Sequence, residues 1–273
     1  MTGPARASPV SGVERIAEAF ASARADSRRA ALMPYLMGGF PDAVTSRRIG
    51  FAYVEGGADL IELGVPFSDP LADGPVIHAA GSAALRAGAT MPEVLAVGRE
   101  LATAVPVVVM CYANLIFARG FERFVAALVE SSASGLIVPD LPLEEAPTML
   151  EVCDAYGIAL VPLVAPTTPD ARLAMIGARA RGFLYTLSLT GTTGERARLS
   201  GGLAAVIERA SASTDVPVAV GFGIGTPAQA AAAADAGADG VIVGSRLVRA
   251  AAEPDDPVPA ITDLVREFAD ALR

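Results

Sequence analysis

An acidic residue interrupts one of the most apolar stretches of the chain, IELGVPFSDPLADGP at residues 61–75. Glu62 stands where Leu or Val would pack better, and a buried carboxylate is costly unless it is paired, hydrogen-bonded or neutralised. The loop that follows is stiffened by prolines and presents two more acids, Asp69 and Asp73. Perturbed carboxyl groups collect at catalytic sites, so we take Glu62 and Asp73 as candidate acid–base groups. For Asp69, an ordinary solvated loop position remains open.

The residue types that are missing narrow the chemistry further. All 21 basic residues are arginine, which excludes Schiff-base aldol chemistry, covalent attachment of pyridoxal phosphate and a Walker A lysine. The one histidine, His78, excludes a multi-histidine metal site, and we interpret it as a loop residue near the surface. If the protein is an enzyme, carboxylates are therefore its leading acid–base groups.

Composition suits one large α/β domain or two small ones, with an ample core, since the chain has 273 residues and is 52% hydrophobic. A net charge of −9 without a basic run argues against nucleic acid or an anionic membrane as partner. No apolar run has the length of a bilayer span and the N-terminal residues lack an apolar signal core, so we expect a cytoplasmic protein. Cys111 and Cys153 match no metal or redox motif, and we expect both to be buried as small apolar groups.

Short β-rich runs alternate with helical stretches rich in Ala, Leu and Arg. The expected strands are 32–38, 59–65, 105–112, 135–140, 159–166, 183–189, 217–223 and 240–245. This number of β/α units in a chain of this length predicts a single (β/α)8 TIM barrel. A doubly wound sheet is the alternative, but it usually has fewer parallel strands and a Gly-rich first turn, which is missing here.

One additional helix is expected before the first strand, over residues 13–25, with Ser11 as its cap. Its apolar face would close the floor of the barrel. We expect residues 1–12 to be a disordered tail and residues 13–273 to form the TIM-barrel domain.

A faint internal repeat bears on Glu62. GADLIELGVP at 57–66 aligns with GADGVIVGSR at 237–246, and Glu62 then falls opposite Ile242. Strand alternation places Glu62 on one face with Leu60, which we take to be the barrel interior. The comparison indicates that Glu62 does not serve packing, although a structural carboxylate hydrogen-bonded to neighbouring strands remains the alternative.

Two glycine-rich segments suggest a phosphate site. GFGIGTP at 221–227 ends one expected strand and opens a helix with Thr226 as N-cap and Pro227 in its first turn, and VGSR at 243–246 ends the last strand similarly. Backbone amides at such loops bind anions, and the loops after strands 7 and 8 are the recurrent phosphate site of TIM barrels. Turn glycines without a ligand are the alternative.

The segment SLTGTTGERARLS at 188–200 is rich in Gly and Thr, which fits a mobile lid over a substrate, with Gly194 able to lend an amide to the phosphate. Tyr185 precedes it and points either into the barrel or toward the helices. The residues together indicate a phosphate-ester substrate and an acid–base pair that works without metal or lysine.

The stretch IELGVPFSDPLADGP closely resembles the signature of the tryptophan synthase alpha subunit family. Further blocks match in the family's order, over about residues 13 to 270: YANLIF (112–117), VPDLPLEE (138–145), YTLSLTGTTG (185–194), GFGIGTP (221–227) and VGSRLV (243–248). Two departures stand out, Met37 in place of a small polar residue and Phe183 where an aromatic with a hydroxyl can occur.

The resemblance implies retro-aldol cleavage of indole-3-glycerol phosphate to indole and glyceraldehyde 3-phosphate. It implies Glu62 as the acid–base that protonates indole C3, and Asp73 as the partner of the indole N–H. Further substrate contacts are implied for Tyr185, Thr193, Phe222, Tyr35 and Ile77, and phosphate contacts for Gly194, Gly223, Gly244 and Ser245.

The resemblance also implies a partner, the tryptophan synthase beta subunit, in an alpha2-beta2 assembly that passes indole between the subunits. No cofactor is expected in this chain, because the pyridoxal phosphate belongs to the beta subunit. The implied interface includes Asp69, Pro70, Asn114 and Pro142.

Competing interpretations remain. A phosphosugar isomerase on the same barrel would need a second acid opposite Glu62, for which Asp140 is the tempting candidate. An indoleglycerol-phosphate synthase is disfavoured because it relies on a catalytic lysine. A catalytically silent barrel that only activates a partner is the third, although such a protein need not keep Glu62, Asp73 and a lid.

Overall fold

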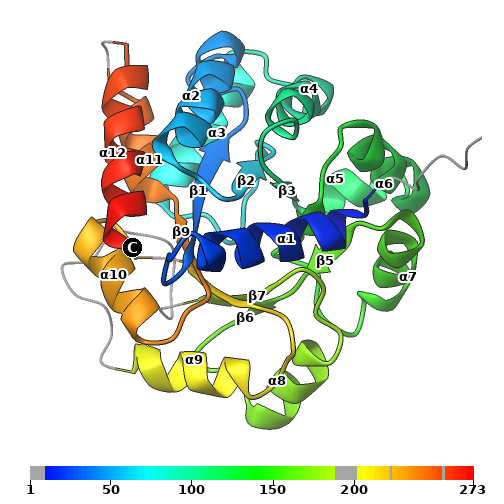
Figure 1. Ribbon diagram of the computed structural model, residues 1–273. Coiled ribbons are helices and arrows are strands. Elements are labelled where there is room, and N and C mark those ends of the chain that lie inside the picture. Colours follow the sequence, from blue (N-terminus) through cyan, green and yellow to red (C-terminus); the bar gives the residue numbers. More distant parts are fainter. Residues whose placement is uncertain (1–9, 188–201, 222, 254–255) are drawn as a thin grey trace, which may run out of the picture.

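The computed structural model describes residues 10–187, 202–221, 223–253 and 256–273 (Figure 1). Within them the strands form one parallel sheet in the order β5-β4-β3-β2-β1-β9-β8-β7-β6. The strands are β1 (Ala31–Met37), β2 (Ile61–Gly64), β3 (Val107–Met110), β4 (Gly135–Ile137), β5 (Ala159–Val161), β6 (Leu163–Val164), β7 (Leu184–Leu187), β8 (Val218–Gly221) and β9 (Gly240–Val243).

Helices surround this sheet and follow most of its strands, as a TIM barrel requires (Figure 1). The helices are α1 (Gly12–Ala25), α2 (Ala43–Gly56), α3 (Pro75–Arg86), α4 (Met91–Leu101), α5 (Ala113–Phe117), α6 (Phe121–Glu130), α7 (Pro147–Tyr156), α8 (Asp170–Gly177), α9 (Leu203–Ser211), α10 (Pro227–Asp235), α11 (Ser245–Ala251) and α12 (Val258–Ala271). The predicted TIM barrel is confirmed.

The fifth expected strand, 159–166, differs from the prediction because it is divided at Pro162 into β5 and β6. β5 pairs with β4, whereas β6 pairs with β7, so the two segments together join both edges of the sheet. Proline has no backbone N–H to donate to a ladder, which favours a break there. The carbonyl of Pro162 still accepts a hydrogen bond of 3.0 Å from the Tyr185 amide.

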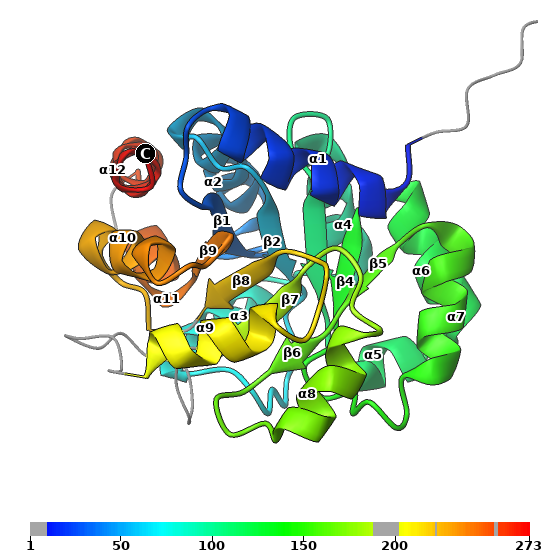
Figure 2. The same cartoon turned by 60° about the horizontal axis from the view of Figure 1, so that its bottom comes forward.

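Helix α1 crosses one end of the barrel (Figure 2). Ser11 caps it through a capping box with Glu14, as the predicted helix start requires. Its buried Ile16 and Phe20 belong to the same apolar cluster as the interior side chains of the strands. The expected closing of the floor is therefore confirmed, while the expected tail falls mainly on residues 1–9, outside the described part.

The two copies of the internal repeat share an aspartate at the end of the barrel that α1 covers. Asp59, just before β2, accepts the backbone amide of Leu32 at 2.8 Å. Asp239, just before β9, accepts that of Val218 at 2.9 Å. Each aspartate thus joins its loop to the neighbouring strand, which explains why the two copies agree at this position.

The apolar core has two main parts, one inside the barrel and one between the strands and the outer helices. Leu60 belongs to the interior cluster, whereas Ile61 and Leu63 belong to the outer one. Strand alternation therefore directs Glu62 inward, as expected.

Cys111 and Cys153 are free and buried, also as expected. In the described ranges, no helix is long and apolar enough to cross a membrane.

Candidate active site

Glu62 lies in the middle of β2 with 1% of its surface exposed. Its ladder neighbours are Tyr35 on β1 and Val108 on β3. Neither carboxylate oxygen has a hydrogen-bond partner among the described residues. Burial, reinforced by the negative charge of Asp73, raises the pKa of Glu62 to about 8. These contacts do not support a structural carboxylate held by its neighbours, and the group is set to exchange a proton near neutrality.

Asp73 lies in the loop between β2 and α3, residues 65–74, and its charge is close enough to act on Glu62. The hydroxyl of Tyr112 donates a hydrogen bond of 2.8 Å to Oδ1 of Asp73. Burial raises the pKa of Asp73, while the Tyr112 hydrogen bond and the charge of His78 oppose that rise. The loop therefore brings the two predicted carboxyl groups into one site.

Tyr112, which has no predicted role of its own, is the second residue after β3 and lies at the same end of the barrel as Asp73. Its oxygen also accepts the backbone amide of Ala72 at 3.1 Å, and its ring stacks on Phe67 at 5.3 Å between centroids. Two signals in the sequence point to it: it begins the matching block YANLIF, and it follows β3, the ladder neighbour of β2.

Two tyrosines flank Glu62 inside the barrel. Tyr35 and Tyr185 are both buried in the interior cluster, so the open question about Tyr185 is decided in favour of the interior. Their hydroxyls occupy space beside glycines: a methyl group on Gly64 would lie 2.0 Å from Tyr35 Oη, and one on Gly221 would lie 2.4 Å from Tyr185 Oη. Burial raises the pKa of both phenols well above the usual range of a tyrosine. Both hydroxyls therefore stay protonated and can donate hydrogen bonds.

Apolar side chains complete this interior. Ile77 on α3 is buried in the same cluster as Tyr35. Met37, one of the two departures from the family pattern, places its Sδ 4.0 Å from Tyr35 Oη. The other, Phe183, packs between Phe20 and Tyr185 with ring centroids 5.9 and 6.3 Å away.

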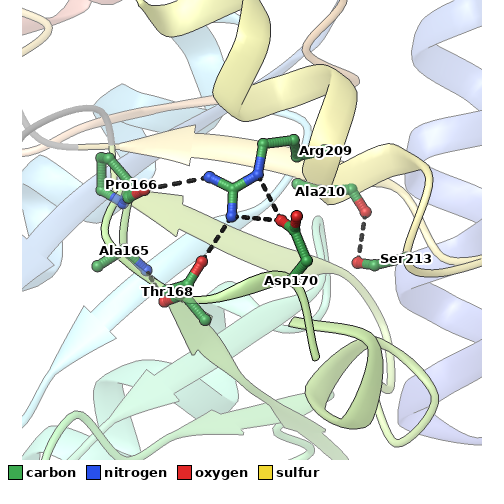
Figure 3. A network of polar contacts seen from close by, with 7 residues as sticks. All are labelled: Ala165, Pro166, Thr168, Asp170, Arg209, Ala210 and Ser213. Atoms are coloured by element: carbon green, nitrogen blue, oxygen red, sulfur yellow. Dashed lines mark hydrogen bonds and ion pairs between the residues drawn. The ribbon is translucent and has the colours of Figure 1, made fainter. Parts of the chain in front are cut away.

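A hollow of about 1030 Å³ opens at the end of the barrel opposite α1, and Asp73 lies in its wall. The loop between β6 and α8 forms part of the wall through Ala165 and Thr168. Arg209 on α9 fixes this loop by donating to the carbonyl oxygens of Pro166 and Thr168 and to the carboxylate of Asp170 (Figure 3). The hollow is thus held open by a defined backbone, and its size suits a drug-sized ligand.

The predicted phosphate loops follow the adjacent strands β8 and β9. Their register, Val220 opposite Val241, brings the two loops to the same level. Gly223 has φ +82°, a conformation that favours glycine, and Gly244 directly precedes α11. Ser245 is the first residue of that helix. The three predicted residues that the structure describes therefore follow two adjacent strands at the same end of the barrel.

Thr226 and Pro227 start α10 as predicted, but two backbone amides before the helix already donate hydrogen bonds within the protein. The side chain of Gln229 accepts hydrogen bonds from the amides of Gly225 and Thr226, at 2.8 and 3.1 Å. An anion at this loop would therefore depend on other amides. The predicted Thr193, Gly194 and Phe222, with the expected lid at 188–200, lie outside the described residues.

The residues expected at a partner interface lie in the segments after β2, β3 and β4, which are neighbours in the sheet. Asp69, Asn114 and Pro142 are exposed, and Pro70 is partly buried. All four therefore belong to the same end of the barrel as Asp73.

Two other expectations concern polar residues near this end. His78 is exposed as expected, but it lies in the first turn of α3 rather than in a loop, because Pro75 starts the helix earlier.

Asp140 accepts the backbone amide of Ala113 at 2.8 Å and so holds the start of α5. Asp140, the second acid that an isomerase would need, therefore has a structural hydrogen bond. In the part of the chain described, no three His, Cys, Asp or Glu side chains gather as a metal site.

Comparisons with known proteins agree with this geometry. A family model described as tryptophan synthase alpha chain matches residues 20–271. The tryptophan synthase alpha chain of Synechococcus elongatus is 45% identical over 259 residues, covering 94% of this chain and 96% of the relative. That of Methanosarcina mazei is 45% identical over 258 residues, covering 94% of each.

Solved structures give the same result. A tryptophan synthase structure from Mycobacterium tuberculosis superposes with a TM-score of 0.88 at 40% identity, covering 95% of this chain and 98% of that chain. The tryptophan synthase alpha chain of Legionella pneumophila gives 0.85 at 34% identity, covering 94% and 97%. The chain belongs to the tryptophan synthase alpha chain family, whose members are lyases that cleave indole-3-glycerol phosphate in partnership with a beta subunit.

Proposed function

We propose that Glu62 is the acid–base group of this cleavage. It would take the proton of the glycerol hydroxyl and deliver a proton to indole C3 as the carbon–carbon bond breaks. The observation that carries this role is a fully buried carboxyl group without a hydrogen-bond partner among the described residues, whose pKa is raised to about 8. Such a group is mostly protonated at neutral pH and reaches comparable amounts of both forms near pH 8, so both forms are accessible to a residue with both roles.

Asp73 in this proposal accepts the indole N–H and stabilises the positive charge that develops on the ring. Its half-buried position and its hydrogen bond from Tyr112 support this role, since a fixed carboxylate needs no reorganisation during the reaction. Tyr35, Tyr185 and Ile77 would enclose the indole ring, together with Phe222 and Thr193.

The phosphate group of the substrate, we propose, binds at the amides of Gly223, Gly244 and Ser245, with Gly194 as a further donor. Support comes from the register of β8 and β9, which places the two loops side by side. Because Gln229 already occupies the amides at the start of α10, the remaining donors in these loops become more important.

The finer features of the assembly are also proposals. We expect an alpha2-beta2 complex in the cytoplasm, with pyridoxal phosphate held by the beta subunit and the contact made through Asp69, Pro70, Asn114 and Pro142. The exposure of most of these side chains at the mouth of the barrel and the absence of lysine from this chain support the arrangement.

The test is indole release from indole-3-glycerol phosphate by wild type and Glu62→Gln, each with and without a tryptophan synthase beta subunit. We expect release by wild type, faster release with the partner, and loss of nearly all activity in Glu62→Gln. Glu18→Gln, an exposed carboxyl on α1 at the other end of the barrel, is the matched control and should match wild type.

Appreciable activity in folded Glu62→Gln would refute the assignment of Glu62. Binding of indole-propanol phosphate without any turnover by wild type would instead favour a barrel that only activates its partner.

A further inference from the structure

Tyr112 connects two parts of the molecule that have separate roles in the proposed function. Its hydroxyl donates to Oδ1 of Asp73 at 2.8 Å and accepts the amide of Ala72 at 3.1 Å. Its ring stacks on Phe67 with an interplanar angle of 27°. Phe67 and Ala72 stand on either side of Asp69 and Pro70, the residues proposed to contact the beta subunit.

The arrangement uses both hydrogen-bonding functions of the phenol. An oxygen that accepts from a backbone amide and donates to a carboxylate has its orientation set at both ends. Because Tyr112 is buried and lies two residues after the end of β3, its hydroxyl is a fixed point against which the loop between β2 and α3 is positioned. A displacement of Phe67 or Ala72 therefore alters the contact with Asp73.

We propose that Tyr112 is a positioning residue that holds the Asp73 carboxylate toward the indole N–H and transmits contact between the beta subunit and the β2–α3 loop to that carboxylate. This inference rests on the proposed function. In this role Tyr112 acts through Asp73, because its hydroxyl is engaged by Asp73 and by the amide of Ala72. Coupling of this kind has to appear as a change in the stimulation by the partner, which a purely structural tyrosine would not affect.

The charged and titratable groups that face Asp73 come from four elements. Glu62 lies on β2, Tyr35 on β1, Tyr112 follows β3 and His78 lies on α3. Of these, the Tyr112 hydrogen bond is the leading influence that favours the ionised carboxylate. Its removal should raise the pKa of Asp73 further, so the ionised form would be lost at a higher pH.

The experiment compares wild type with Tyr112→Phe, which keeps the ring and its stacking and removes only the hydroxyl. We expect kcat/KM for indole release to fall about 10- to 100-fold, the range for a hydrogen bond to a charged group. We also expect the ratio of activity with and without the beta subunit to fall toward one. Tyr53→Phe is the matched control, because its buried hydroxyl donates to the Tyr35 carbonyl at 3.1 Å and has no contact with Asp73.

A second measurement isolates Asp73. Binding of indole-propanol phosphate is followed against pH in a Glu62→Gln background, so that the half-buried Asp73 is the remaining carboxyl group of the proposed acid–base pair. Adding Tyr112→Phe should move the midpoint at which binding weakens on acidification to higher pH, whereas adding Tyr53→Phe should leave it in place.

Phe67→Leu keeps the phenol and loosens its stacking, and it should reduce stimulation by the partner more than activity of the isolated chain. An unchanged pH midpoint and an unchanged stimulation ratio in folded Tyr112→Phe would overturn the inference. Failure of wild type to release indole would overturn the proposed function instead, so the two results are distinguishable.

Discussion

Tyr35 lies directly opposite Glu62 in the parallel ladder between β1 and β2, and its hydroxyl fills the space beside the next inward-facing residue of β2, Gly64. The wall next to the proposed acid–base group is therefore a tyrosine ring that fits only because residue 64 has no side chain.

The first prediction follows from that close approach. An alanine methyl at position 64 would lie 2.0 Å from Tyr35 Oη, so Gly64→Ala must displace the ring. We expect a loss of about 1–3 kcal/mol in the free energy of unfolding, as for overpacked cores, and at least about tenfold weaker binding of indole-propanol phosphate. Urea denaturation and calorimetric titration measure the two effects.

Gly202→Ala is the control for that variant, because a methyl there meets no atom of the described residues within 4 Å. Adding Tyr35→Phe to Gly64→Ala should recover part of the stability by removing the clashing oxygen. Wild-type stability and binding in Gly64→Ala would contradict the proposed fit.

A second prediction concerns pH and stability. The pKa of Glu62 is raised from 4.5 to about 8, so the folded state binds one more proton than the unfolded state between these values. Stability contributed by this group therefore falls as pH rises from about 4.5 to about 8, by a few kcal/mol, and then levels off. Glu62→Gln cannot ionise, so it should be more stable than wild type at pH 8 to 9 and should lack this slope.

Thermal unfolding of the two proteins from pH 5 to pH 9 measures this difference. Parallel curves for wild type and Glu62→Gln would show that Glu62 ionises in the folded protein as it does in water.

The third prediction separates stability from activity at the other end of the barrel. Asp59 forms an ion pair of 2.7 Å with Arg28, and both side chains are largely buried. Asp59→Ala should cost about 2–4 kcal/mol of unfolding free energy. It leaves the largely buried Arg28 guanidinium without its carboxylate, with only the Gly57 carbonyl as acceptor, and it removes the acceptor of the Leu32 amide. Indole release by the folded fraction should match wild type.

Asp239→Ala is the matched variant from the second copy of the repeat. Its partner Arg24 is 55% exposed, so the cost should be smaller than at Asp59. A larger loss at Asp239 than at Asp59 would contradict this order.

The fourth prediction uses the chain's two cysteines. Burial raises the pKa of the Cys111 and Cys153 thiols to about 12 each, so their thiolate forms are scarce in the folded protein. We expect labelling by a chromogenic disulfide reagent at pH 8 to be slow under native conditions and complete in urea. Rapid labelling of both thiols in the native state would show that this part of the core opens readily.

The sequence by itself determined the features that depend on local pattern. Alternating apolar residues marked the strands, a Ser11 cap marked the start of α1, and the repeat singled out Glu62 against Ile242. Such signals are readable because propensity, capping and strand alternation act over a few neighbouring residues.

Only the tertiary structure decided the contacts between distant segments. It joined Tyr112 to Asp73, directed Tyr185 into the barrel, divided the fifth strand at Pro162 and assigned the amides of the α10 start to Gln229. Each of these depends on loop conformation and on the register between strands. Because both are set by packing of the whole barrel, neighbouring residues in the sequence carry little information about them.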